Sequence, residues 1–171
     1  MNQLCLFIVL GCACALTAVS APMLGGRVLD VMNGPSVTIL GGDNIPHIIR
    51  LYGVDTLPKT EPWGKKARER LEQMIVRKNV KVSWTKKSEL GYPLGTIYLG
   101  KGNANLQLLK EGLAWHCTHF GKDPVYEKAE AEAKEAKRGM WKEPPELPDE
   151  AAHHPKPVEA ATRATPKKKG K

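Results

Sequence analysis

Apolar β-branched and aliphatic side chains recur in short runs between Arg27 and Pro58, and turn residues separate these runs. The turn residues are Asn33-Gly34 and Gly41-Gly42-Asp43-Asn44, which tolerate the positive φ angles of tight turns. This pattern predicts three short strands between Arg27 and Gly53. Their apolar positions are Val28, Val31, Val37, Ile39, Ile48 and Leu51.

A helical period replaces the alternation between Pro62 and Lys78, and Asn79 is expected to stop this helix. The pattern returns to period two in Val80–Thr85, and Tyr92–Leu99 reads as another strand. The predicted helix has an apolar face and an opposite basic face. The apolar face comprises Ala67, Leu71, Met74 and Ile75, and the basic face comprises Lys65, Lys66, Arg68, Arg70 and Arg77.

Two further helices are predicted near the end of the ordered pattern. Asn103-Ala104-Asn105 caps a short helix over Leu106–Glu111, whose Leu106 and Leu109 face inward. Asp123 caps the last helix, which runs to about Arg138 before the C-cap Gly139 and a folded-back Met140-Trp141. The apolar face of that helix comprises Tyr126, Ala129, Ala133 and Ala136. The order of elements predicts a small α+β domain that is mainly β.

Both ends of the chain differ from this central domain in composition. Residues 1–21 are apolar, carry no charged side chain and end in small residues, which is typical of a signal peptide cut near Ser20 or Ala21. We therefore expect a secreted, extracellular protein that is not stably inserted in a membrane. The alternative is that the segment is retained as an N-terminal anchor. Residues 142–171 are rich in Pro, Glu, Ala and Lys and predict a disordered tail. The folded domain is therefore expected over 22–141.

Charge and cysteine content narrow the class of protein further. The 171 residues carry a formal net charge of +8, which favours polyanionic partners. Of the four cysteines only Cys117 lies outside the first 21 residues, so the domain cannot form an internal disulfide. Trp115-His116-Cys117-Thr118-His119 is either a metal site or a buried thiol between two unrelated histidines. The spacing matches no zinc pattern, which favours the buried thiol.

Four segments carry a resemblance to a known family. They are Arg50-Leu51-Tyr52-Gly53-Val54-Asp55, Glu61–Ala67, Asn105–His116 and Ala131–Trp141, and they occur in the family's order. Together they resemble the staphylococcal nuclease-like (thermonuclease) family. The resemblance implies a five-stranded barrel of the oligonucleotide/oligosaccharide-binding (OB) type with three helices.

The resemblance also implies a site, because enzymes of this family cut a phosphodiester with one Ca²⁺. Such chemistry needs oxygen ligands for the cation, a carboxylate for the attacking water and guanidinium groups for the phosphate. Asp55 and Thr56 match metal-ligand positions, and Arg50 matches the first phosphate-binding arginine.

Three other positions of the family's site have changed. Pro35 replaces a metal-ligand aspartate, and Tyr92 replaces the second arginine. The general-base glutamate is replaced by Pro58, or by Lys59 if one residue is inserted. The resemblance therefore predicts an inactive nuclease-like protein that needs no cofactor, with Ca²⁺ as the ion if activity remains.

Two alternatives concern the residues that remain. Glu61 or Glu89 could substitute for the lost groups and retain a weak or altered Ca²⁺-dependent endonuclease. Arg50 and Asp55 could instead form an ion pair at the mouth of the barrel that serves only the fold.

Three functions follow from these expectations. The first is a secreted module that binds nucleic acid or another polyanion, the second is the altered endonuclease, and the third is a scaffold for protein partners. For the first function, Tyr92, Phe120 and Trp115 could stack on bases. Phosphates would be bound by Arg50, Lys86, Lys87, the basic face of the first helix and the tail Pro166–Lys171.

Overall fold

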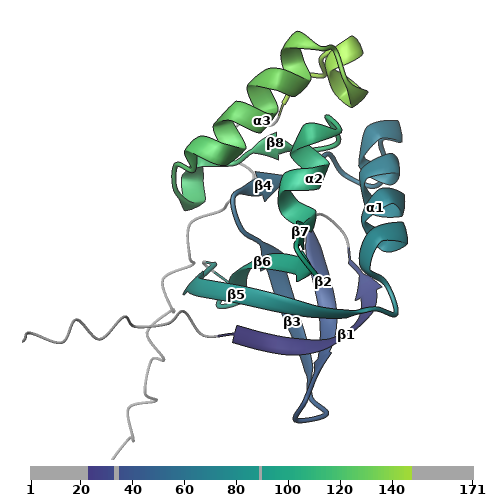
Figure 1. The fold of residues 1–171 in the computed structure, drawn as a ribbon. Helices are drawn as coiled ribbons and strands as arrows, with labels where there is room; N and C mark the ends of the chain where they lie inside the picture. The colour runs from purple at the N-terminus through teal and green to yellow at the C-terminus, as the bar shows by residue number, and fades with distance from the viewer. Residues whose placement is uncertain (1–22, 33–34, 89, 148–171) are drawn as a thin grey trace, which may run out of the picture.

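The computed structural model describes residues 23–32, 35–88 and 90–147. Within them five strands close into a barrel, and three α-helices lie above it in Figure 1. The barrel strands are β1 (Met23–Val31), β2 (Ser36–Gly41), β3 (Pro46–Leu51), β5 (Asn79–Lys87) and β6 (Pro93–Leu99). Neighbours follow the order β3-β2-β1-β5-β6, and a parallel pairing of β3 with β6 closes the ring. The expected α+β fold with a five-stranded barrel is confirmed.

The helices and the shorter elements complete the described fold. The helices are α1 (Pro62–Ile75), α2 (Ala104–Lys110) and α3 (Pro124–Glu135). The strand β4 (Val54–Asp55) pairs with β8 (Trp115–His116), and β7 (Gly102–Asn103) extends the sheet beside β6. Two 3₁₀ turns, η1 (Thr118–Phe120) and η2 (Gly139–Lys142), follow β8 and α3 respectively. The predicted signal segment 1–21, the tail from residue 148 onward, Asn33-Gly34 and Glu89 lie outside the described residues.

The alternation of apolar residues fills the barrel as the sequence predicts. Val28, Val31, Val37, Ile39 and Leu51 are fully buried. Of the apolar strand positions, Ile48 is only half-buried, and Ile49, which pairs with Val37 across the β2–β3 ladder, lies in the core. Ala67, Leu71 and Ile75 of α1 pack on this core, together with Leu108 and Leu109 of α2. Leu106, expected to face inward, is only half-buried.

The predicted end of α1 at Lys78 is wrong, because the backbone of Arg77 and Lys78 is hydrogen-bonded to β1 instead of continuing the helix. Arg77 has a left-handed backbone with a φ of 61°, and its N–H donates to the carbonyl of Val28 at 2.9 Å. The N–H of Val28 in turn donates to the carbonyl of Lys78 at 3.0 Å. The helix therefore ends at Ile75, and Asn79 begins β5.

A second apolar cluster joins the last helix to the barrel. Leu57, Trp115, Ala133, Met140 and Trp141 are buried in it, and Trp63 and Leu147 pack against it. The expected folding-back of Met140 and Trp141 is confirmed as η2. The last helix is shorter than predicted, since Lys137 has a φ of 48°, and Ala136 is exposed instead of lying on the apolar face.

A charged network ties α1 to the end of α2. Arg70 donates from Nε and Nη2 to the carboxylate of Glu111 at 2.8 and 2.7 Å. Gln107 donates to the same carboxylate at 2.7 Å. The hydrogen bonds from Arg70, and to a lesser extent that from Gln107, hold the pKa of Glu111 below its ordinary value of 4.5.

This network predicts a pH-dependent stability. A folded-state pKa below 4.5 means that the contribution of Glu111 is complete above that pH and is lost as pH falls through the lower value. We expect Glu111→Gln to cost about 1 kcal/mol at pH 7, since solvent screens a partly exposed pair. Urea unfolding of both proteins at pH 7 and at pH 3 measures the difference, which should shrink at pH 3. Glu132→Gln, in an exposed pair of 3.9 Å with Lys128, is the control and should show no such trend.

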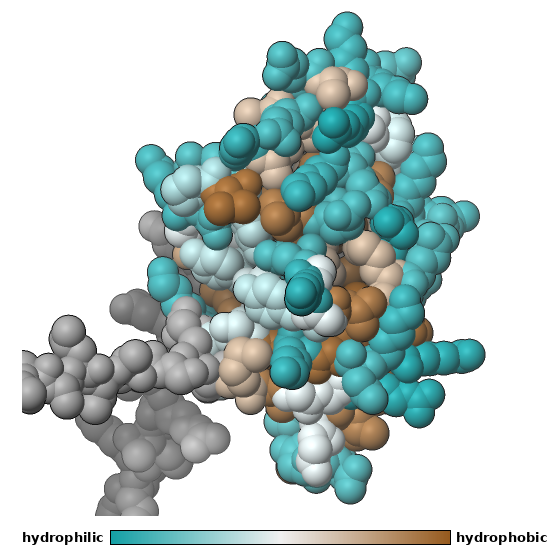
Figure 2. Space-filling view, in the orientation of Figure 1, coloured by the Kyte–Doolittle hydropathy of each residue, from teal (hydrophilic) through white to brown (hydrophobic). Residues whose placement is uncertain are grey.

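The surface carries apolar side chains only in small patches on the face drawn in Figure 2, where hydrophilic side chains separate them. The large exposed apolar residues belong to β1, to three hairpin turns and to the start of α3, and single residues of this kind are normal on a protein surface. In the described part of the chain, no helix combines the length and the apolar character needed to cross a membrane.

Candidate functional site

The two retained charged residues form an ion pair where β3 ends. Arg50 comes from the end of β3 and Asp55 from β4, and Nη2 of Arg50 donates to Oδ2 of Asp55 at 3.0 Å. The Asp55 side chain is 1% exposed and that of Arg50 is 21% exposed. The other oxygen of Asp55 accepts the Thr56 N–H at 2.8 Å. The expectation of an ion pair at the barrel mouth is therefore confirmed in its geometry.

The turn that joins Arg50 to Asp55 is held by two residues whose role the sequence analysis missed. Asn105 donates from Nδ2 to the carbonyls of Tyr52 and Gly95 at 3.0 and 3.1 Å, and its Oδ1 accepts the Ile97 N–H at 3.1 Å. Asn105 was expected in the cap of α2. The cap is Asn103, whose Oδ1 accepts the Leu106 N–H at 3.0 Å, so α2 begins at Ala104.

His116 is the second of these residues. Its Nδ1 lies 2.8 Å from the carbonyl of Gly53, and its Nε2 lies 3.3 Å from the N–H of Asp123. This pairing requires the tautomer with the proton on Nδ1. Gly53 has a φ of 68°, and a Cβ there would lie 2.9 Å from the ring of Tyr126, so the turn accepts only glycine.

The space beside Thr56 is nearly closed. Pro35, Thr56 and Lys59 line a hollow of about 10 Å³. A cavity of about 10–15 Å³ is the least that holds one water molecule. Pro35 is buried, and its carbonyl accepts the Leu51 N–H at 2.7 Å. This hollow therefore has no room for a phosphate together with a hydrated cation.

Two lysines at the end of β5 lie across β6 from Arg50, since Arg50 and Lys86 both pair with Leu94 of β6. Lys86 and Lys87 end β5, both side chains are exposed, and neither has an acidic partner among the described residues. The Nζ of Lys86 lies 3.4 Å from the carbonyl of Phe120. Tyr92, in the turn that follows, is 40% exposed, and its N–H donates to Ser88 Oγ at 3.1 Å. The β5–β6 turn thus presents an aromatic ring beside two lysines.

The other two aromatic residues expected to stack on bases are not at the surface. Phe120 is only 8% exposed and packs with Leu94 and Cys117, while the Cζ of Arg50 lies 5.5 Å from its ring centroid. Trp115 is 4% exposed and belongs to the second apolar cluster, so its role as a base platform is wrong. The ring of Phe120 therefore packs against the guanidinium of Arg50.

The interpretation of Cys117 as a buried thiol agrees with the fold. Cys117 is fully buried, and no group of three or more His, Cys, Asp or Glu side chains in the described ranges could hold a metal ion.

The basic face of α1 is largely neutralised by ion pairs. Arg68 donates to Glu72 at 2.8 Å, Arg70 binds Glu111, and Lys65 lies 3.9 Å from Glu69. Lys66 instead lies 4.0 Å from the ring centroid of Trp63. Because its charges are paired, α1 is a weaker candidate for binding phosphates than the β5–β6 turn.

Comparison with known sequences decides the family. The sequence model of the staphylococcal nuclease homologue family matches residues 48–143, which is more than half of the chain. The chain belongs to this family. The match begins within β3 and includes Arg50, Asp55, the β5–β6 turn and all three α-helices of the described structure.

Several curated relatives of this family member carry nuclease names. An uncharacterized endonuclease of Haemophilus influenzae is 30% identical over 115 residues, which cover 67% of this chain and 65% of that protein. An uncharacterized endonuclease of Escherichia coli is 27% identical over 124 residues, covering 72% and 80% respectively. A probable staphylococcal-like nuclease of Oryza sativa is 36% identical over 93 residues, but these cover only 28% of its length. The family member thus spans less than two thirds of the Haemophilus and rice proteins.

The donor set in this family member does not fit the Ca²⁺ that the family uses. Ca²⁺ takes about 6–8 oxygen ligands, several of them from carboxylates. Asp55 supplies the one carboxylate at the matched positions, and its two oxygens already bind Arg50 and the Thr56 N–H. Pro35 offers no side-chain oxygen, and its carbonyl belongs to the barrel's hydrogen bonds.

The candidate replacement for the general base is not in the site. Glu61 immediately precedes α1, is exposed and does not line the hollow beside Thr56. Pro58 and Lys59, the alternatives at the glutamate position, are both exposed. Glu89 lies outside the described residues.

Proposed function

We propose that the protein is a catalytically inactive member of the staphylococcal nuclease homologue family that binds single-stranded nucleic acid at the Arg50 end of the barrel. The observation that carries this proposal is the occupation of both Asp55 oxygens by Arg50 and the Thr56 amide. A carboxylate held in this way serves the fold, and a cation at Asp55 would have to compete with the guanidinium of Arg50 for it.

The chemistry of hydrolysis supports inactivity. A general base accelerates such a reaction by about 10²–10⁴, and one charge-stabilising donor contributes about another 10²–10³. Pro58 or Lys59 stands at the base position and Tyr92 at the second arginine position. Neither Pro58 nor Lys59 carries a carboxylate, so the base position lacks the group on which the family's reaction depends.

The arrangement of the β5–β6 turn supports binding. Lys86 and Lys87 can contact successive phosphates, and the ring of Tyr92 offers a face to an unpaired base. Arg50 has one buried Nε with no hydrogen-bond partner among the described residues. Because this Nε is buried, a phosphate can reach Arg50 only through the 21% of its side chain that is exposed. The apolar, uncharged segment 1–21 supports export of this module from the cell.

The test uses the full chain with fluorescein-labelled single-stranded DNA and RNA across a Ca²⁺ series. Denaturing gels measure cleavage, and anisotropy measures binding as a function of salt. We expect no cleavage and salt-sensitive binding. Tyr92→Ala should weaken binding about tenfold, since stacking contributes about 1–3 kcal/mol per base. For the double variant Lys86→Gln/Lys87→Gln, the slope of log K against log salt should become less steep by about 1.4, because each phosphate contact on a single strand contributes about 0.7 to that slope.

Matched variants on the helices serve as controls. Val125→Ala removes an exposed apolar side chain from α3, and Lys110→Gln/Lys128→Gln removes two charges from α2 and α3. Both should bind as the unaltered protein does. Cleavage that EGTA abolishes and Asp55→Asn removes would make the protein an endonuclease, as its relatives are named. If the protein shows neither cleavage nor binding, the search moves to protein partners.

A further inference from the structure

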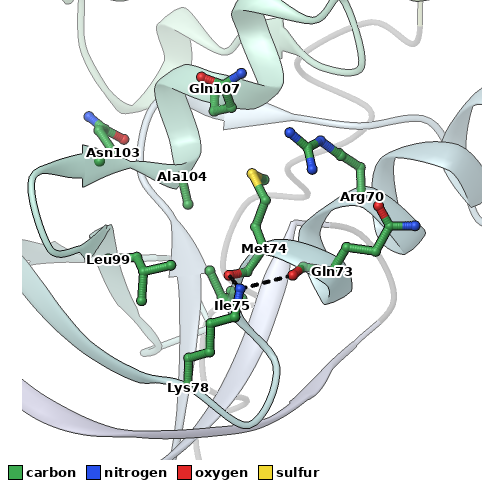
Figure 3. A pocket seen from close by; sticks show the side chains of 10 residues that line it. Arg70, Gln73, Met74, Ile75, Lys78, Leu99, Asn103, Ala104 and Gln107 are labelled. Carbon is green, nitrogen blue, oxygen red and sulfur yellow. Dashed lines mark hydrogen bonds between the residues drawn. The ribbon is translucent and has the colours of Figure 1, made fainter.

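A pocket with an apolar floor opens between α1, α2 and the end of β6, and the proposed function does not use it. It has a volume of about 300 Å³, and ligand pockets occupy about 300–1,000 Å³. Figure 3 shows the side chain of Met74 running toward Ala104 and that of Leu99 pointing toward Ile75. These four side chains form the apolar floor. None of the residues that line the pocket lines the hollow beside Thr56.

The rim of the pocket offers both hydrogen-bond donors and acceptors. The carboxamide of Gln73 is exposed, and neither its oxygen nor its nitrogen has a hydrogen-bond partner among the described residues. Gln107 uses its nitrogen on Glu111, so its oxygen still has acceptor capacity. A carboxamide pairs with the edge of a nucleobase through one donor and one acceptor. The two glutamines thus match the polar edge of a planar base that lies with one face on the apolar floor.

The charge around the pocket is positive. Lys78 donates to the carbonyls of Gln73 and Met74 at 3.1 and 2.7 Å, as the dashed lines in Figure 3 show. An ammonium group has three N–H donors, so Lys78 keeps one for a ligand. Arg70 also lines the pocket, but its charge is paired with Glu111 through Nε and Nη2, so Lys78 supplies the lining charge that has no acidic partner among the described residues. None of the described lining residues is acidic.

We propose that this pocket binds one unstacked nucleotide, with the base on the Met74 and Leu99 floor and the phosphate at Lys78. If the nucleotide is part of a bound single strand, the inference rests on the proposed function. An apolar pocket that also offers hydrogen bonds is the arrangement by which proteins hold a base taken out of its stack. A nucleotide is the ligand that fits an apolar floor together with the free carboxamide of Gln73, the acceptor oxygen of Gln107 and the ammonium group of Lys78.

The test reads the pocket directly through methionine methyl groups. The chain has five methionines, so ¹³C-methyl labelling of the full protein gives a simple NMR spectrum, and Met74→Leu assigns the pocket signal. Adenosine 5′-monophosphate is the probe, and inorganic phosphate and adenosine are tested separately. We expect a saturable shift of the Met74 signal with the nucleotide and a weaker response to either fragment. The signals of Met140, which is fully buried, and of Met32 should not move.

Two substitutions test the charge and the amide. Lys78→Gln should weaken nucleotide binding about tenfold, the effect of losing about 1.4 kcal/mol at one charged hydrogen bond. Gln73→Glu should weaken it further because the new carboxylate repels the phosphate. Lys128→Gln, with the same loss of net charge on α3, is the matched control and should bind normally. Thermal melting of each variant excludes unfolding as the cause.

The outcomes separate this inference from the proposed function. A Met74 signal that stays unchanged at saturating nucleotide, or equal affinities for Lys78→Gln and Lys128→Gln, would overturn the pocket. If oligonucleotides still bind and Tyr92→Ala weakens them, the proposed function stands without it. A shift of Met74 with the nucleotide but no binding of oligonucleotides leaves a mononucleotide pocket and removes the proposed function.

Discussion

Replacing Asp55 with alanine is expected to lower the free energy of unfolding by about 3–5 kcal/mol, the cost of leaving one partner of a buried ion pair uncompensated. Asp55 is 1% exposed, so its removal leaves the guanidinium of Arg50 at the barrel mouth with no carboxylate at 3.0 Å. The Thr56 N–H loses its acceptor in the same step. Urea unfolding followed by tryptophan fluorescence measures the loss.

The double substitution Arg50→Met/Asp55→Leu distinguishes a structural ion pair from a retained metal site. Apolar replacement of both partners removes the uncompensated charge, so the double variant should be more stable than Asp55→Ala alone. Glu69→Ala, which breaks an exposed pair of 3.9 Å with Lys65, should cost less than about 1 kcal/mol. A loss of less than about 1 kcal/mol for Asp55→Ala would mean that solvent screens this pair as well. The ion pair would then not explain why Asp55 is retained.

Asn105→Ala is expected to destabilise the protein by about 3–4 kcal/mol, because each buried polar group left without a partner costs about 1–3 kcal/mol. The substitution removes the hydrogen bonds to the carbonyls of Tyr52 and Gly95 and to the N–H of Ile97. Asn105 is fully buried, so solvent reaches these groups only if the structure opens. The loss is smaller than the sum of three full penalties because neighbouring effects are not additive.

Asn103→Ala is the matched control on the same helix. Asn103 caps α2 through one bond to the Leu106 N–H, and loss of an N-cap typically costs about 1 kcal/mol. Because Asn105 holds the turn between Arg50 and Asp55, Asn105→Ala should also weaken oligonucleotide binding under conditions where the protein stays folded. Equal losses of stability for Asn103→Ala and Asn105→Ala would contradict the assignment of Asn105 as the residue that fastens this turn.

In the site, residue types alone predict some features, and others required the coordinates. The residues that the resemblance puts at three of the family's site positions are Pro35, Pro58 or Lys59, and Tyr92, and the sequence alone shows that none of them carries a carboxylate or a guanidinium. The pairing of Arg50 with Asp55 was only one of two alternatives, since the sequence does not say whether the carboxylate faces the arginine or an open cavity. The structure places Nη2 of Arg50 and Oδ2 of Asp55 3.0 Å apart.

Aromatic residues and helix ends depended on contacts from distant parts of the chain. Trp115 and Phe120 read as candidate surface rings, yet α3 and η2 bury Trp115, and Leu94 and Arg50 cover Phe120. α1 stops at Ile75 because the backbone of β1 bonds to Arg77, a competition that no local propensity encodes. The role of Asn105 was missed for the same reason, since two of its partners lie in the turn after β3 and in β6.

The sequence by itself determined the strands of the barrel, the three helices and the family. Period-two and helical spacing decide which faces are apolar, and a missing side chain is visible without coordinates. Only the tertiary structure decided that Asp55 is held by Arg50, that the charges of α1 are paired, and that a pocket lies between α1 and α2. The pocket and the Arg70–Glu111 pair join segments far apart in the chain. Arg50 and Asp55 are only five residues apart, but Arg50 lies at the end of β3, where that strand pairs with β6.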